Sequence, residues 1–302
     1  MKQLRYPLVL DGGLSNVLEG MGCNLEHPLW TALLIQTNPE LIVEAHLAYL
    51  EAGATCITSS GYQASIEGYK QLGLPRKNAE QLILKSLDLA LKARQLFLEK
   101  SRNDPSINIA ASMGPYGAFL ADGSEYTGDY DASEEQLIQF HKSRIDLLER
   151  SAADFFAFET IPSLQELRVL SKLLEMSSKP SWVSFSCKNE VYLNDGYKIS
   201  KAASLLADHP TIFAIGVNCT APKFISDIIG TLKEYAPDKK IIVYPNSGEV
   251  YHAKTKSWYG VSDPEAFEKM ALEWNEKGAD MIGGCCRIGH EHISRISNVF
   301  QP

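Results

Sequence analysis

The chain has 302 residues, of which 45% are hydrophobic and 22% charged, a composition typical of a globular protein. Its 37 acidic and 29 basic residues give a formal net charge of −8, and no basic run is longer than a pair, so we expect no nucleic-acid-binding surface. No stretch approaches the roughly 18 consecutive apolar residues of a membrane span, and only three apolar positions precede Asp11, too few for a signal-peptide core, so we expect a cytoplasmic protein without membrane contact.

Short apolar runs rich in β-branched residues, each bounded by turn residues, recur along the chain. Such runs are typical of buried parallel strands. In chain order, eight strands are predicted, at residues 8–10, 55–59, 107–112, 155–159, 182–186, 212–218, 240–244 and 280–283.

The segments between these runs have helical periodicity and recognisable helix starts. Ser133 stands three residues before Gln136, which is the spacing of a capping box, and Asn38 and Asp263 each precede a proline. The predicted helices are residues 39–52, 78–100, 133–152, 163–177, 200–207, 221–235 and 263–278.

Strands that alternate with helices, without a linker rich in proline, glycine and serine, predict one (β/α)8 TIM barrel. We expect this barrel to occupy residues 1–302 as a single domain, rather than two doubly wound domains. The longest irregular stretches each follow a strand, at residues 12–36, 60–77, 114–132 and 246–261. In a barrel such loops lie at the carboxyl ends of the strands, where active sites are built.

The cysteines are the most informative residues at the predicted strand ends. Cys219 follows the sixth strand, and Cys285 and Cys286 follow the eighth. Neighbours in a regular strand point to opposite faces, so the adjacent pair can bind one ion only if the backbone leaves the pleat, which Gly283 and Gly284 would permit. Three thiolates meeting near the barrel axis would leave a fourth tetrahedral position open, as in catalytic zinc sites.

The spacing also leaves other interpretations open. The adjacent cysteines could form a vicinal disulfide, or all three could be ordinary buried residues. Cys23, Cys56 and Cys187 are predicted to be packing residues. His290 and His292 form a His-x-His pair at the start of a helix, a pattern that usually faces solvent.

Five motifs near the strand ends are specific enough to suggest a family. They are residues 10–13 (Leu-Asp-Gly-Gly), 157–162 (Ala-Phe-Glu-Thr-Ile-Pro), 216–219 (Gly-Val-Asn-Cys), 243–249 (Val-Tyr-Pro-Asn-Ser-Gly-Glu) and 283–287 (Gly-Gly-Cys-Cys-Arg). Through them the chain resembles the homocysteine S-methyltransferase family over nearly its whole length. Residues 114–130 favour the branch that uses S-methylmethionine or S-adenosylmethionine over its betaine-dependent relatives. The chain departs from the family at residues 287–290 (Arg-Ile-Gly-His), where relatives commonly carry a threonine.

The resemblance implies a zinc ion, Zn2+, bound by Cys219, Cys285 and Cys286, the same residues that the strand ends bring together. It further implies that homocysteine is bound by Asp11, Gly12, Gly13, Glu159 and Asn218. The two carboxylates would receive its ammonium group, and the backbone amides around residues 12–14 would receive its carboxylate, because a glycine turn presents N–H groups to an anion.

The implied reaction transfers a methyl group from a sulfonium donor to the homocysteine thiolate and gives methionine. Coordination to zinc deprotonates a thiol, so no dedicated general base is required. Aromatic faces stabilise a sulfonium cation as they do an ammonium cation, so the donor is expected to contact tyrosines on the loops at the barrel mouth. The predicted donor contacts are Tyr116, Tyr126, Asp129, Tyr244 and Asn246.

Alternative functions remain at this point. A betaine-type homocysteine methyltransferase or a selenocysteine methyltransferase would use similar chemistry. Asp11 and Glu159 could be the paired carboxylates of a glycosidase, although that leaves the adjacent cysteines unexplained. A non-catalytic barrel with a redox-sensing or structural zinc-cysteine site belongs to another class, which metal analysis and a thiol-methylation assay would distinguish.

Overall fold

The computed structural model describes residues 4–101, 105–248, 250–252, 257–259 and 262–301. Eight parallel strands pair in the order β1-β10-β7-β6-β5-β4-β3-β2, and a bridge between Leu10 and Cys56 joins the two ends of the sheet. The strands are β1 (Leu8–Val9), β2 (Cys56–Thr58), β3 (Asn108–Met113), β4 (Phe155–Ile161), β5 (Ser181–Phe185), β6 (Ile212–Asn218), β7 (Lys240–Tyr244) and β10 (Met281–Ile282).

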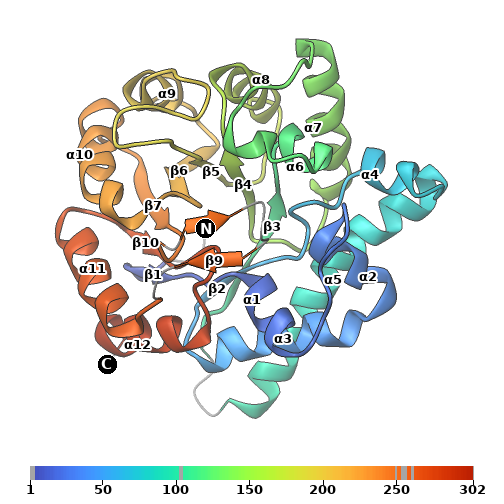
Figure 1. Cartoon of the computed structure of the whole chain (residues 1–302), viewed down its shortest axis with the longest axis horizontal. Coiled ribbons are helices and arrows are strands. Elements are labelled where there is room, and N and C mark those ends of the chain that lie inside the picture. Colours follow the sequence, from blue (N-terminus) through green and yellow to red (C-terminus); the bar gives the residue numbers. More distant parts are fainter. Residues whose placement is uncertain (1–3, 102–104, 249, 253–256, 260–261, 302) are drawn as a thin grey trace.

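The helices surround this ring of strands (Figure 1). They are α1 (Leu14–Gly20), α2 (Leu34–Thr37), α3 (Pro39–Glu51), α4 (Ile66–Gln71), α5 (Arg76–Lys100), α6 (Tyr116–Leu120), α7 (Glu134–Leu148), α8 (Leu164–Leu174), α9 (Ile199–Leu206), α10 (Ile225–Tyr235), α11 (Pro264–Glu276) and α12 (His290–Phe300). Three 3-10 turns are η1 (Trp30–Leu33), η2 (Ser124–Tyr126) and η3 (Pro222–Phe224). The (β/α)8 barrel predicted from the sequence is therefore confirmed. None of the helices in the described ranges combines the length and apolar composition that a membrane span requires.

The predicted helix starts are only partly borne out. Ser133 and Gln136 form the reciprocal capping box at the start of α7. Asp263 caps α11 by accepting a hydrogen bond from the Glu265 N–H. Asn38 precedes α3, but its side chain makes no capping hydrogen bond.

A separate apolar cluster fills the interior of the barrel, distinct from the layer between the strands and the helices. Its largest member, Trp182, is fully buried. The cluster consists of Leu8, Leu10, Cys56, Ala110, Phe155, Ala157, Trp182, Ala214, Ile242, Tyr244 and Met281. Because inward-facing side chains fill this interior, polar chemistry is confined to the residues at and beyond the carboxyl ends of the strands.

The main difference from the predicted elements lies after the last strand and in the long loops. β10 ends at Ile282, three residues before Cys285, although the N–H groups of Gly283 and Gly284 still donate 3.0 Å hydrogen bonds to the Val243 and Asp11 carbonyls. A Cβ atom on Gly283 would lie 2.5 Å from the Leu10 Cβ, and one on Gly284 would lie 2.1 Å from the Ile288 Cγ2, so both positions require glycine for close approach. The long loops also contain α1, α2, α4, α6 and the antiparallel hairpin of β8 (Val250–His252) with β9 (Ser257–Tyr259).

Candidate metal centre

Three thiols meet at the carboxyl end of the barrel. The Cys219 Sγ lies 2.9 Å from the Cys285 Sγ and 3.4 Å from the Cys286 Sγ. All three sulfur atoms lie within 4.8 Å of one another, and they are the group of metal-ligating side chains found in the described ranges. β6 and β10, which are far apart in the sequence and both border β7, bring the three residues together.

At and next to these cysteines, two residues other than glycine have a positive φ. Cys219 has a φ of 47° and Arg287 a φ of 66°, both in the left-handed region. Such a conformation costs on the order of 1–3 kcal/mol and persists at functional sites. Gly283 and Gly284, which we expected to permit a break from the pleat, do not have a positive φ, and both approach neighbouring residues closely.

The three sulfurs suit a tetrahedral zinc ion. Zinc–sulfur bonds of about 2.3 Å in a tetrahedron separate sulfur atoms by about 3.8 Å, so small side-chain movements would bring this cluster to that geometry. All six cysteines are free thiols, so the vicinal-disulfide interpretation does not describe this structure. Three thiolates fill three positions and leave one for a further ligand.

The thiols share their charge unequally. Hydrogen bonds from Cys219 and Cys285 hold the pKa of the Cys286 thiol well below its usual value. The hydrogen bond to Cys219 raises the pKa of Cys285 well above the usual value, and burial adds to that effect. One thiolate therefore forms readily in this cluster, and the other two thiols favour deprotonation only when a cation is close.

Asn218 supports both the end of β4 and one of the sulfurs. Its Oδ1 accepts hydrogen bonds from the Thr160 N–H at 2.7 Å and the Ser184 hydroxyl at 2.8 Å. Its Nδ2 donates to the Thr160 hydroxyl at 2.8 Å and points to the Cys285 Sγ at 3.9 Å. Thr160 has a φ of 61°, so Asn218 holds an unfavourable backbone conformation in place. The predicted contact of Asn218 with homocysteine stays a prediction.

Two buried carboxylates, Asp11 and Glu159, lie at the barrel mouth, close enough for the charge of Glu159 to act on Asp11. Asp11 accepts a 2.8 Å hydrogen bond from the Thr58 N–H, and Glu159 accepts hydrogen bonds from the hydroxyls of Ser112 and Tyr244. Burial raises the pKa of Asp11 to about 8, with a further contribution from the charge of Glu159. Burial likewise raises the pKa of Glu159 to about 7. A cation bound between them would offset both effects.

The glycine turn after β1 packs directly under the cysteine pair. A Cβ atom on Gly13 would lie 2.6 Å from the Cys285 carbonyl oxygen, and one on Gly12 would lie 2.3 Å from the Ile288 carbonyl oxygen. The Gly13 N–H donates a 2.9 Å hydrogen bond to the same Ile288 carbonyl. This amide therefore has a partner within the protein, and the predicted contact of the glycine turn with the homocysteine carboxylate stays a prediction.

The sequence comparisons identify the family. The family model described as homocysteine S-methyltransferase matches residues 8–300. The chain belongs to this family. It is 46% identical over 297 residues to homocysteine S-methyltransferase YbgG of Bacillus subtilis (strain 168), with 97% of this chain and 94% of that protein covered. It is 40% identical over 291 residues to the homocysteine S-methyltransferase of Escherichia coli (strain K12), with 96% and 94% covered.

Solved structures agree with the sequence comparisons. The metallated form of the homocysteine methyltransferase MmuM from Escherichia coli superposes with a TM-score of 0.87 at 36% identity, covering 97% of this chain and 96% of that one. The oxidized form superposes with a TM-score of 0.88 at 36% identity, covering 97% and 95%. The chain is therefore an enzyme, a homocysteine methyltransferase.

Of the donor contacts predicted for this methyltransferase, Tyr126 lies beside the thiols. Its hydroxyl is 3.8 Å from the Cys219 Sγ, and 48% of the residue is exposed. Tyr244 is buried instead, and its hydroxyl accepts from the Trp182 Nε1 at 3.1 Å and contacts Ser184 and Glu159. This tyrosine is therefore hydrogen-bonded to the buried carboxylate of Glu159, and its contact with the donor stays a prediction.

The other three predicted donor contacts lie on the surrounding loops. Tyr116 packs with aromatic rings, at centroid distances of 5.4 Å from Phe119 and 5.2 Å from Phe140. Asp129 is exposed, and the Asn246 Oδ1 accepts a 2.9 Å hydrogen bond from the Gly248 N–H. Their contact with the donor stays a prediction.

Sequence reasoning did not select two further residues near the thiols of the methyltransferase. Tyr62 follows β2, and its hydroxyl is hydrogen-bonded to Thr160. Burial, together with the negative charges of Glu125 and the cysteines, raises its pKa well above the usual value. Glu125 lies on η2 next to Tyr126. The position of Tyr62 at a strand end was a signal for the first residue, whereas nothing in the sequence pattern distinguishes Glu125 from the other acidic loop residues.

Within the described ranges, the other cysteines and the His290–His292 pair do not belong to the cluster. Cys23, Cys56 and Cys187 pack in the apolar cores, as predicted. His290 is exposed, but His292 is buried, and its Nε2 lies 2.9 Å from the Ser262 hydroxyl. The expectation that the pair faces solvent is therefore wrong for His292, because the Phe267 ring packs against it edge-on at 5.6 Å.

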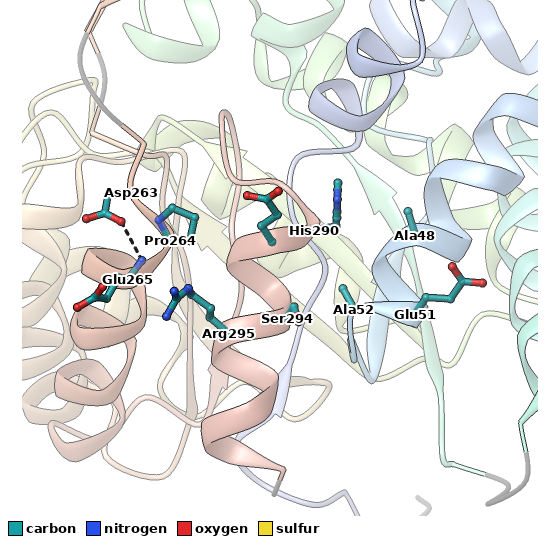
Figure 2. Close-up of a pocket in the computed structure, with 10 residues that line it drawn as sticks. Ala48, Glu51, Ala52, Asp263, Pro264, Glu265, His290, Ser294 and Arg295 are labelled. Carbon is teal, nitrogen blue, oxygen red and sulfur yellow. Dashed lines mark hydrogen bonds between the residues drawn. The ribbon is translucent and has the colours of Figure 1, made fainter.

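A surface pocket of about 720 Å³ lies between α3, α11 and α12, apart from the thiols (Figure 2). Four of its ten lining residues are acidic, and His290 and Arg295 are the basic residues among the ten. None of its ten lining residues belongs to the cysteine cluster or to the buried carboxylate pair. We therefore assign the chemistry to the barrel mouth.

Proposed function

We propose that this methyltransferase moves a methyl group from a sulfonium donor, S-methylmethionine or S-adenosylmethionine, to the homocysteine thiolate and releases methionine. In this proposal Cys219, Cys285 and Cys286 hold Zn2+, and residues 1–302 act as one barrel domain. The observation that carries it is the cluster of three sulfur atoms within 4.8 Å of one another, at the mouth of a barrel of this family. The expected cytoplasmic location stays a prediction.

Zinc, when bound by these cysteines, would keep the homocysteine thiol deprotonated in the remaining position. The three thiolates of the chain carry more negative charge than the ion carries positive charge, so the centre stays anionic. Because opposite charges attract strongly where water is excluded, this centre favours a cationic donor beside it. The chain then acts mainly by aligning two sulfur atoms with the methyl group between them.

Asp11 and Glu159 bind the homocysteine ammonium group in this proposal. This role is supported by the raised pKa values of the two carboxyl groups, about 8 for Asp11 and about 7 for Glu159, because both are buried without a cation nearby. An ammonium group between them would restore both to the ionised form. With the amino acid held at this end, its thiol is restricted to the region of the three sulfurs.

One experiment tests the metal and the donor together. The protein is purified, its zinc content is measured, and methionine formation from homocysteine is followed in a mixture of S-methylmethionine, S-adenosylmethionine and betaine. We expect one zinc per chain and consumption of a sulfonium donor. Cys285→Ala should lose metal and activity, whereas Cys23→Ala, which changes a packing cysteine, should keep both. Full activity in the metal-free wild-type protein, or consumption of betaine alone, would contradict the proposal.

A further inference from the structure

Several buried polar atoms on the loops after β2 and β3 have no hydrogen-bond partner within the described ranges. They are Ser60 Oγ, Gln63 Oε1, Ser124 Oγ and Glu125 Oε2. Buried polar atoms nearly always have a partner, and each one left unpaired costs about 1–3 kcal/mol. Unpaired atoms on two loops that follow neighbouring strands at the barrel mouth therefore indicate a place where the chain binds a polar ligand.

Glu125 connects this group of atoms to the reaction centre. It precedes Tyr126, whose hydroxyl lies 3.8 Å from the Cys219 Sγ. It is also close enough to Tyr62 and Cys219 for their charges to interact. Burial, with a smaller contribution from Cys219, raises the pKa of Glu125 to about 7. The carboxylate is thus partly withdrawn from water near the sulfurs.

Tight packing fixes the backbone from which the Glu125 carboxylate extends. α6 and η2 meet at Gly117, where a Cβ atom would lie 2.5 Å from the Glu125 backbone nitrogen. The amide nitrogen of Gln63 donates a 3.1 Å hydrogen bond to the Ala118 carbonyl, on the same turn of α6, which leaves its Oε1 unpaired. The Glu125 backbone and the Gln63 side chain are therefore both held against α6.

The chemistry of the unpaired atoms selects the group they bind. A carboxylate and an amide oxygen only accept hydrogen bonds, and a serine hydroxyl both accepts and donates. A primary ammonium group offers three N–H donors and a positive charge, which matches this set. A sulfonium centre and a quaternary ammonium group have no N–H to give. A carboxylate ligand would be repelled by Glu125.

We propose that Glu125, assisted by the amide oxygen of Gln63, binds the primary ammonium group of the methyl donor. This rests on the proposed function, in which Asp11 and Glu159 already hold the ammonium group of homocysteine. S-Methylmethionine and S-adenosylmethionine both carry a primary ammonium, whereas betaine does not. Glu125 is therefore a residue that determines donor specificity.

A matched pair of donors tests the proposal. S-Methylmethionine is compared with its desamino analogue 4-(dimethylsulfonio)butanoate, which keeps the sulfonium and the carboxylate but lacks the ammonium. In the wild-type enzyme, kcat/KM for S-methylmethionine should exceed that for the analogue about 10- to 100-fold, as expected for a charge-assisted hydrogen bond. Glu125→Gln should reduce this ratio to within about 3-fold of unity, mainly through KM for S-methylmethionine.

Controls separate this role from a structural one. Asp131→Asn changes an exposed acid on the same loop and should leave the ratio unchanged. Gln63→Met removes the second acceptor and should lower the ratio by a smaller factor. Zinc content, and homocysteine affinity measured by calorimetry, should be equal in the wild-type and Glu125→Gln proteins.

Three results would overturn the assignment. They are an unchanged ratio in Glu125→Gln, an equal loss of kcat/KM with both donors, or a wild-type enzyme that does not discriminate between them. Absence of transfer from any sulfonium donor in the wild-type enzyme would instead reject the proposed function itself.

Discussion

Gly13→Ala probes how closely the glycine turn supports the cysteine pair. The new Cβ would lie 2.6 Å from the Cys285 carbonyl oxygen, against a limit of 3.0 Å below which real Cβ atoms essentially never come, so the two backbones must separate by at least 0.4 Å. Overpacking of this kind costs about 1–3 kcal/mol of folding free energy. It also moves a proposed zinc ligand by more than the ~0.2 Å tolerance of a metal site, so we expect zinc affinity to fall about 10- to 100-fold.

The assay combines urea unfolding of the metal-free protein with zinc titration against a competing chelator. Gly20→Ala is the matched control, because it makes the same change at the end of α1, where a Cβ atom would meet nothing within 4 Å. The control should be more stable by about 0.5–1 kcal/mol and bind zinc like the wild type. Wild-type zinc affinity in Gly13→Ala would refute the reasoning, because the turn would then not support the ligands.

Further predictions concern buried polar groups. Asn218→Ala leaves the Thr160 N–H without an acceptor and should reduce stability to urea by about 3 kcal/mol, together with a loss of zinc affinity in the chelator assay. Glu166→Ala leaves His141, the Tyr116 N–H and the Tyr130 hydroxyl without their acceptor, so we expect a loss of about 3–5 kcal/mol in urea unfolding. Glu134→Ala at an exposed ion pair should change stability by less than about 1 kcal/mol. Burial lowers the pKa of His46 from 6.5 to about 4, so the unfolded chain binds a proton at a higher pH than the folded protein does. The free energy of unfolding should therefore fall as the pH drops from about 6.5 to 4. Relative to His46→Leu, the wild type should lose about 3 kcal/mol over this range in urea unfolding.

The barrel could be predicted from the sequence because each buried strand is a short apolar run. Boundaries were less predictable where tertiary contacts decide them. The last strand was expected to continue to Gly283, but β10 ends at Ile282, and the two glycines that follow lie in close contact with Leu10 and Ile288. No local pattern announces such contacts, since the partners lie far away in the sequence.

The metal cluster was predictable because the carboxyl ends of parallel strands converge, which brings Cys219 to the cysteine pair. The contacts that hold the cluster and its surroundings in place could not be predicted. The positive φ of Cys219, the hydrogen bond of the Gly13 amide to Ile288 and the burial of Glu125 by packing at Gly117 all depend on the folded backbone. The sequence indicates which groups converge, and packing decides which of their atoms remain free to bind a substrate.

X-ray absorption at the zinc edge tests the central claim most directly. In the zinc-loaded enzyme we expect three sulfur neighbours at about 2.3 Å, from Cys219, Cys285 and Cys286, and a fourth sulfur at a similar distance when homocysteine is added. Cys285→Ala should reduce the sulfur count or remove the metal. A site with fewer than three sulfur neighbours in the wild-type enzyme, or one whose coordination does not change on addition of homocysteine, would contradict the account.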